Sequence, residues 1–293
     1  MPPPIRYRSP DEDSARWLEF AFREGDIVIS TRSKSGTTWM QMICALLVFQ
    51  CPQLPHPLPQ LSPWLDWLGT PIDVVISGLE SQDHRRFVKT HTPLDGIPID
   101  GRAMYIVVAR HPLDMAVSLY HQGDNLDRRR IAELTGQSLP SEPERPRPPL
   151  REWLLRWIDS GATPRDDMDS LPGVMWHLRD TWDRRAANVV MVHYADLLAD
   201  LDGEMHRLAQ LLGVNVADDL WPTLVEAAKF DTMRAQAEHV APDADRVMKD
   251  RTLFFRRGSS GAGGEALSVD EMAHYVERAR SLVPPDLFDW LHR

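Results

Sequence analysis

The residues with the clearest chemical potential form a short loop that could bind an anion. Lys34 and Gly36 are followed by two threonines, Thr37 and Thr38. The free N–H groups at the start of a helix, together with the helix dipole, favour a negatively charged group. Lys34 would add a positive charge, and Gly36 would let the backbone approach the ligand closely. This spacing predicts a phosphate- or sulfate-binding loop if a strand precedes it and a helix follows.

The residues on either side of the loop have those two patterns. Residues 26–30 are short, apolar and β-branched, as in a buried parallel strand. The usual nucleotide P-loop places its lysine after a second glycine, whereas Lys34 precedes the only glycine of this loop. On the residues alone, an anion site of another type and an ordinary helix start both remain open. After the loop, apolar residues recur with helical spacing at Trp39, Met42, Ile43, Leu46 and Leu47.

The rest of the chain alternates between strand and helix patterns. Such alternation predicts an α/β fold, in which a central, mainly parallel sheet carries helices on both faces. Because no internal repeat is present, we expect a single domain over 1–293. The strands expected beyond the first are 86–90, 103–109 and 188–194. The helices expected are 150–159, 173–186, 197–212, 217–229 and one that starts at Ser268 with a capping box to Glu271.

Two segments lack both patterns. Residues 123–149 are rich in Arg, Pro and Glu, and the prolines from Pro140 to Pro149 exclude a helix or a central strand there. Residues 258–265 are rich in glycine. Because loops beside a sheet often close over a ligand, both segments are predicted to be flexible lids.

Composition limits the setting and the partners. The net charge of −10 makes nucleic acid an improbable partner, so an anionic ligand needs a local group of cations. Two cysteines, Cys44 and Cys51, cannot make a disulfide framework, which favours a reducing, cytoplasmic setting. No signal peptide or membrane-spanning run is expected. The oligomeric state is not indicated.

Four stretches, in chain order, resemble motifs of the PAPS-dependent sulfotransferase family, where PAPS is 3′-phosphoadenosine 5′-phosphosulfate. Residues 34–39 resemble the loop that binds the 5′-phosphosulfate. Residues 87–93 resemble the segment of the catalytic histidine, and residues 110–118 resemble the segment that binds the 3′-phosphate. Residues 254–258 resemble the family's F-x-R-K/R-G motif. The resemblance covers nearly the whole chain and implies the P-loop-NTPase-like sulfotransferase fold.

The resemblance also implies roles for individual residues. His91 would be the general base, and Lys34 and Lys89 would stabilise charge during sulfuryl transfer. The product would be PAP, the desulfated nucleotide, and no metal would be needed because the lysines neutralise charge. The residues implied in nucleotide binding are Lys34, Ser35, Gly36, Thr37, Thr38, Trp39, Arg110, Ser118, Tyr194, Phe230, Phe255, Arg256, Arg257 and Gly258.

The acceptor is less well defined by the sequence. The chain looks most similar to the actinobacterial branch that includes glycolipid sulfotransferases, which implies a small, lipophilic acceptor with a hydroxyl: a glycolipid, alcohol or phenol. Residues 261–265 lack the family's tryptophan, which predicts a looser loop over the nucleotide. Ala228 and Lys229 replace the Thr-Ser that often precedes the phenylalanine near the adenine. A P-loop-type small-molecule kinase and a PAP-binding protein without activity are the alternatives.

Overall fold

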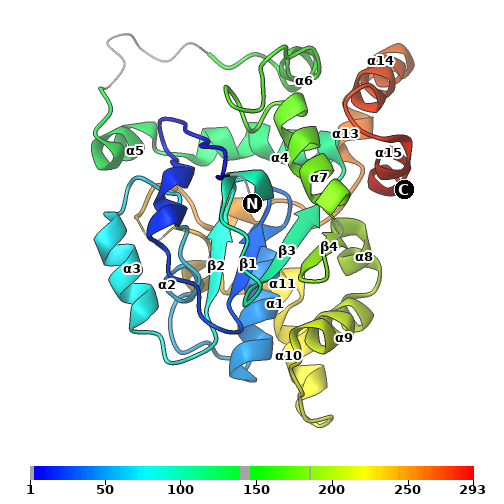
Figure 1. Cartoon of the computed structure of the whole chain (residues 1–293). Helices are drawn as coiled ribbons and strands as arrows, with labels where there is room; N and C mark the ends of the chain where they lie inside the picture. Colours follow the sequence, from blue (N-terminus) through cyan, green and yellow to red (C-terminus); the bar gives the residue numbers. More distant parts are fainter. Residues whose placement is uncertain (1–2, 139–145, 185, 244) are drawn as a thin grey trace.

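The computed structural model describes residues 3–138, 146–184, 186–243 and 245–293. At its centre is a four-stranded sheet with the strand order β2-β1-β3-β4, in which all neighbouring strands are parallel (Figure 1). The prediction of one α/β domain with a parallel sheet is therefore confirmed. The strands are β1 (Ile27–Ser30), β2 (Phe87–Thr90), β3 (Met104–Ala109) and β4 (Val189–His193).

Both faces of the sheet are buried, because successive side chains of each strand enter opposite apolar clusters. Val28 and Val107 pack in one cluster, whereas Ile29 and Ile106 pack in the other. The first cluster is covered by α3 (Ile72–Glu80), α4 (Pro112–Asn125), α6 (Leu150–Ile158), α7 (Leu171–Arg184), α14 (Val269–Arg280) and α15 (Pro285–Leu291). The second is covered by α1 (Thr37–Phe49), α2 (Leu58–Leu61), α8 (Tyr194–Ala199), α9 (Leu201–Leu212), α10 (Trp221–Ala227), α11 (Phe230–Ala235) and α12 (Ala237–Val240).

The strand order brings two helix starts to one edge of the sheet. β1 lies between β2 and β3. The connection after β1 therefore places β2 on one side of it, and the next connection crosses back to place β3 on the other side. In open α/β sheets, ligands bind at the carboxyl ends of the strands where the order reverses in this way. The loop after β1 leads into α1, and Arg110 and His111 lead from β3 into α4, with Pro112 in the first turn as predicted.

Several predicted helix boundaries are shifted. The helix predicted over 197–212 is two helices, α8 and α9, because Asp200 ends the first and caps the second through Gly203 N. The helix from Ser268 is confirmed, with its capping box to Glu271. No helix among the described residues has both the length and the apolar character to cross a bilayer.

The two predicted irregular segments are partly helical, so the prediction of irregular structure is wrong there. α5 (Arg128–Thr135) lies within 123–149, capped by the Asp127 carboxylate and by Gly136 in the left-handed conformation. A short helix, α13 (Ala262–Glu265), lies within 258–265. Residues 139–145 lie outside the described residues. The lid role of both segments stays a prediction.

Candidate active site

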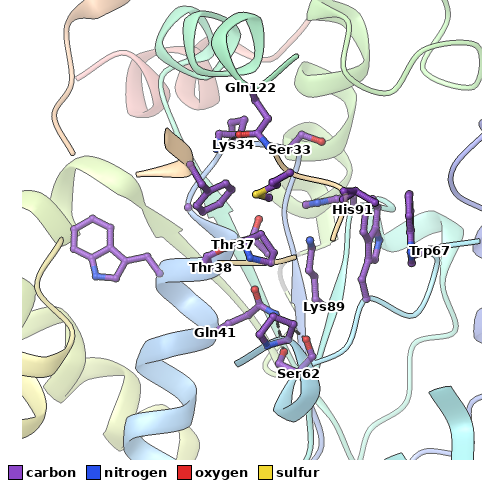
Figure 2. Close-up of a pocket in the computed structure, with 18 of the residues that line it drawn as sticks. Ser33, Lys34, Thr37, Thr38, Gln41, Ser62, Trp67, Lys89, His91 and Gln122 are labelled. Carbon is purple, nitrogen blue, oxygen red and sulfur yellow. Dashed lines mark hydrogen bonds between the residues drawn. The ribbon is translucent and has the colours of Figure 1, made fainter. Parts of the chain in front are cut away.

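A cavity of about 580 Å³ opens at the carboxyl edge of the sheet. Figure 2 shows Lys89 and His91 in its middle, between Thr37 and Thr38 of α1 and Trp67. One predicted residue, Ser35, does not line this cavity: its side chain is buried and its N–H donates to the Arg32 carbonyl at 3.2 Å. The predicted residues that do line it are Lys34, Gly36, Thr37, Thr38, Trp39, Lys89, His91, Arg110, Ser118, Tyr194, Phe230, Phe255, Arg256, Arg257 and Gly258.

At two positions that line the cavity, any residue other than glycine would place its Cβ too close to an aromatic ring. Gly36, the N-cap of α1, has φ +108°, and a Cβ there would lie 3.0 Å from the Tyr194 ring. Gly258 has φ +63°, and its Cβ would lie 2.5 Å from the Phe230 ring. Lys34 also has a positive φ of 64°, a conformation that costs a residue with a Cβ about 1–2 kcal/mol. Such local strain is typical of a binding loop.

Three cations face the same space without a carboxylate partner. Within the described parts of the chain, no ion pair includes Lys34, Arg110 or Arg256. The Nε atoms of both arginines are buried and have no hydrogen-bond partner. Because buried donors are almost always satisfied in a working protein, these orphaned N–H groups fit an anionic ligand.

The contacts of these cations are with carbonyls and rings instead. Arg110 donates to the backbone oxygens of Lys34 at 3.1 Å and Ser259 at 3.2 Å, and its guanidinium lies 4.5 Å from the centre of the Tyr194 ring. The Lys34 ammonium lies 3.6 Å from the centre of the Phe254 ring and donates to Gln122 at 3.3 Å. These contacts hold the cations in place without neutralising them.

The same arrangement lowers the pKa of both lysines. Burial, followed by the charges of Arg110, Lys89 and Arg256, lowers the pKa of Lys34 well below its usual value. Burial lowers the pKa of Lys89 to about 8, although Glu12 and Asp66 oppose the shift. An anion bound among these groups would raise the pKa of both lysines and so favour their charged forms.

The geometry of His91 fixes its tautomer. Its Nδ1 lies 2.5 Å from the Thr31 carbonyl oxygen, which can only accept, so Nδ1 carries the proton. Burial, with the cations Lys89 and Arg32 nearby, lowers the pKa of His91 well below its usual value. The ring is therefore neutral at neutral pH, with its lone pair on Nε2. No described residue forms a hydrogen bond with Nε2.

Two residues that the sequence did not single out hold the His91 segment. The buried Asp66 carboxylate accepts hydrogen bonds from Thr90 Oγ1 at 2.5 Å and from His91 N at 3.3 Å. Arg32, paired with Asp169 at 2.7 Å, donates to the His91 carbonyl. No local pattern could have found them, because each acts across a long sequence separation.

The far side of the cavity is aromatic and apolar. Trp64 and Trp67 stack with ring centres 5.2 Å apart, and the Trp67 N–H donates to Asp245 at 2.7 Å. Lys89 lies 4.3 Å from the centre of the Trp64 ring, and His91 packs edge-on against the same ring. Further apolar residues that line the cavity are Pro59, Val75, Leu79, Leu126, Ile131, Val247 and Met248.

The glycine-rich segment after Gly258 is anchored to α4. The Asp114 carboxylate in the first turn of α4 accepts hydrogen bonds from the N–H groups of Gly261 at 2.8 Å and Gly263 at 2.9 Å. Gly263 packs so closely on Leu113 that a Cβ would lie 2.3 Å from it. These contacts attach residues 261–263 to the helix that starts at the 3′ side of the predicted nucleotide site.

Comparison with known proteins identifies the family. The sulfotransferase domain family matches residues 24–280 of the chain. The chain belongs to the sulfotransferase family. Glycolipid sulfotransferases of Mycobacterium bovis and Mycobacterium tuberculosis are each 39% identical to it over 307 aligned positions, spanning 98% of this chain and 94% of their own length. Human sulfotransferase 2B1 is 26% identical, spanning 82% of this chain and 60% of its own length.

Solved structures share the fold of this sulfotransferase. A retinol dehydratase in complex with retinol and PAP has a TM-score of 0.68 at 18% identity, covering 93% of this chain and 85% of its own. Mouse sulfotransferase SULT7A1 complexed with PAP has a TM-score of 0.67 at 19% identity, covering 95% and 91%. The predicted family and fold are confirmed, and family membership decides against the small-molecule kinase.

Proposed function

We propose that the chain transfers the sulfuryl group of PAPS to a hydroxyl of a glycolipid or a similar lipophilic alcohol or phenol, with His91 as the general base. The observation that carries this proposal is the juxtaposition of three unpaired cations with a neutral imidazole in one cavity. The cations suit a doubly phosphorylated nucleotide, and the imidazole suits an acceptor proton.

The donor would bind across the two helix starts. Lys34, Thr37 and Thr38 would hold the 5′-phosphosulfate at the start of α1, where the N–H groups and hydroxyls converge. Arg110 and Ser118 of the β3–α4 region would hold the 3′-phosphate, with Arg256, Arg257 and the Gly258 N–H closing over it. Trp39, Tyr194, Phe230 and Phe255 would enclose the adenine.

The reaction would be an in-line displacement at sulfur. The acceptor oxygen forms a bond to sulfur while the bond from sulfur to the 5′-phosphate oxygen breaks. The hydroxyl proton moves to Nε2 of His91, and PAP leaves with the electron pair. Lys34 and Lys89 would neutralise the negative charge on the leaving phosphate and on the sulfuryl oxygens.

The acceptor side supports a lipophilic molecule with a polar head. Its wall combines the Trp64–Trp67 stack with aliphatic side chains, and the mycobacterial relatives are named as glycolipid sulfotransferases. Residues 52–70 and the described part of 123–149 both contribute to the cavity lining, through residues such as Pro59 and Ile131. The cytoplasmic setting and the independence from metal stay predictions.

Replacing the base tests the proposal. His91→Ala should lower the rate of label transfer from PAPS about 10²–10⁴-fold, while calorimetry finds an unchanged dissociation constant for PAP. His56→Ala is the matched control, because His56 is exposed and lies outside the cavity. Near-normal turnover in His91→Ala would remove the assigned base. PAP binding by the wild type with no transfer to any glycolipid, alcohol or phenol would favour the PAP-binding protein without activity.

A further inference from the structure

Glu12 is a buried carboxylate in the cavity that the proposed reaction does not use. It precedes the short 3₁₀ helix η1 (Ser14–Glu19) and lines the same cavity as Lys89 and His91. Its side chain is only 8% exposed, and its Oε2 atom is fully buried without a hydrogen-bond partner. Within the part of the chain that the structure describes, no side chain or backbone N–H donates to this carboxylate.

The backbone, not the side chain, explains why this segment is fixed. Glu12 forms an isolated antiparallel bridge with Trp67, and the Leu68 N–H donates to the Asp11 carbonyl at 2.9 Å. These contacts place Glu12 against the aromatic half of the cavity. A buried carboxyl without a partner costs stability, so the fold by itself gives no reason for a glutamate here.

The burial of Glu12 and the charges around it indicate which ligand group it could bind. Burial raises its pKa to about 8, with Asp66 and Asp169 adding to the shift and with Arg32 and Lys89 opposing it. A protonated carboxyl can both donate and accept a hydrogen bond, as a hydroxyl does, and an ionised carboxylate still accepts one. An apolar ligand would leave Oε2 unsatisfied, and the nearby cations disfavour an ammonium group.

We propose that Glu12 binds a second hydroxyl of the acceptor, beside the one that is sulfated, and so selects sugars and other polyols over alcohols with a single hydroxyl. This rests on the proposed function, in which the reacting hydroxyl is held by His91. The Glu12 carboxyl and the His91 imidazole line one cavity, and the charge of Lys89 acts on both, so we place two hydroxyls of one acceptor between them. Trp64 and Trp67 would then contact the less polar part of the acceptor.

The test compares two acceptors with the same alkyl chain, octyl β-D-glucoside and 1-octanol. The wild type should have the higher kcat/KM for the glucoside. Glu12→Ala should reduce the ratio of the two kcat/KM values about 2–10-fold, the effect of losing one hydrogen bond, because the loss should fall on the glucoside more than on octanol. Glu12→Gln should retain part of the preference, because its amide still forms hydrogen bonds. Glu24→Gln is the control, since Glu24 is exposed and lies outside the cavity.

The same comparison can be made by binding. Calorimetry on the enzyme–PAP complex should give a weaker affinity for the glucoside in Glu12→Ala, even if neither acceptor turned over. Its thermal midpoint should match or exceed that of the wild type, because no partner loses a hydrogen bond. The inference is overturned if kcat/KM falls by the same factor for both acceptors in Glu12→Ala. It is also overturned if neither the kcat/KM ratio nor the affinity for the glucoside changes. Unchanged PAP binding without turnover would instead count against the proposed function alone.

Discussion

The two halves of the cavity are built in different ways. The half proposed to bind the donor has charges and backbone held at helix starts, with Lys34 and Gly36 before α1 and Arg110 before α4, and the rings proposed to enclose the adenine. The acceptor half consists of rings and aliphatic side chains, with the Trp64–Trp67 stack as its largest element. Lys89 and His91, at the end of β2, lie between them and touch Trp64. The donor half thus depends on backbone geometry at helix starts as well as on side chains, whereas the acceptor half depends on side-chain packing.

This difference has a functional consequence. The proposed nucleotide can be bound by strands and helix starts that the fold itself supplies. The proposed acceptor is contacted by segments outside the sheet, where side chains can change without disturbing the strands. Substitutions should therefore affect one half without the other.

The largest effect within this comparison is expected for Gly36→Ala. A Cβ at φ +108° is strained and lies 3.0 Å from Tyr194, so the loop or the ring must move. PAP affinity should fall about tenfold, equivalent to about 1.4 kcal/mol, and the affinity for octyl glucoside should not change. Calorimetry with PAP and with octyl glucoside measures the two affinities.

Gly136→Ala is the matched control for that change. Gly136 also has a positive φ, +69°, but a Cβ there would meet nothing within 4 Å, and it lies outside the cavity. Its free energy of unfolding should fall by about 1–2 kcal/mol with PAP affinity intact. An equal change in PAP affinity in Gly36→Ala and Gly136→Ala would mean that the Gly36 loop does not hold the nucleotide.

An effect of similar size should appear in the pH dependence of kcat/KM. His91 acts when neutral, and its pKa is lowered, so activity should not decline as the pH falls from 8 to 6.5. Lys89 acts when charged, and its pKa of about 8 predicts a decline above that pH, roughly tenfold at pH 9 if no ligand restores the charge. Lys89→Arg should keep its charge and shift the decline to higher pH. A decline that is unchanged in Lys89→Arg would assign it to another group.

The sequence could predict which residues gather in the proposed donor half because they form continuous motifs that directly follow strands. Lys34 to Thr38 follow β1, and Arg110 follows β3, so the order of strand, loop and helix places them at one edge. The predicted fold was correct for the same reason, since four apolar runs alternated with helices.

The acceptor half could not be predicted in the same way. Glu12, Trp67 and Asp245 come from three distant segments, and only the folded chain brings them to one cavity. Asp66 has no local motif, although it holds the His91 segment. α5 was missed because the proline-rich run after it dominated the pattern, even though Asp127 and Gly136 are good helix caps.

The assignment of the nucleotide to the donor half can be tested by removing one phosphate from the ligand and one side chain from the protein. Calorimetry would compare PAP with adenosine 5′-monophosphate, which lacks the 3′-phosphate. The wild type should bind PAP more tightly, Arg110→Ala should reduce this preference at least about tenfold, and Ser118→Ala should reduce it less. Equal affinities in the wild type, or the same proportional loss for both nucleotides in both variants, would contradict a 3′-phosphate held by Arg110 and Ser118.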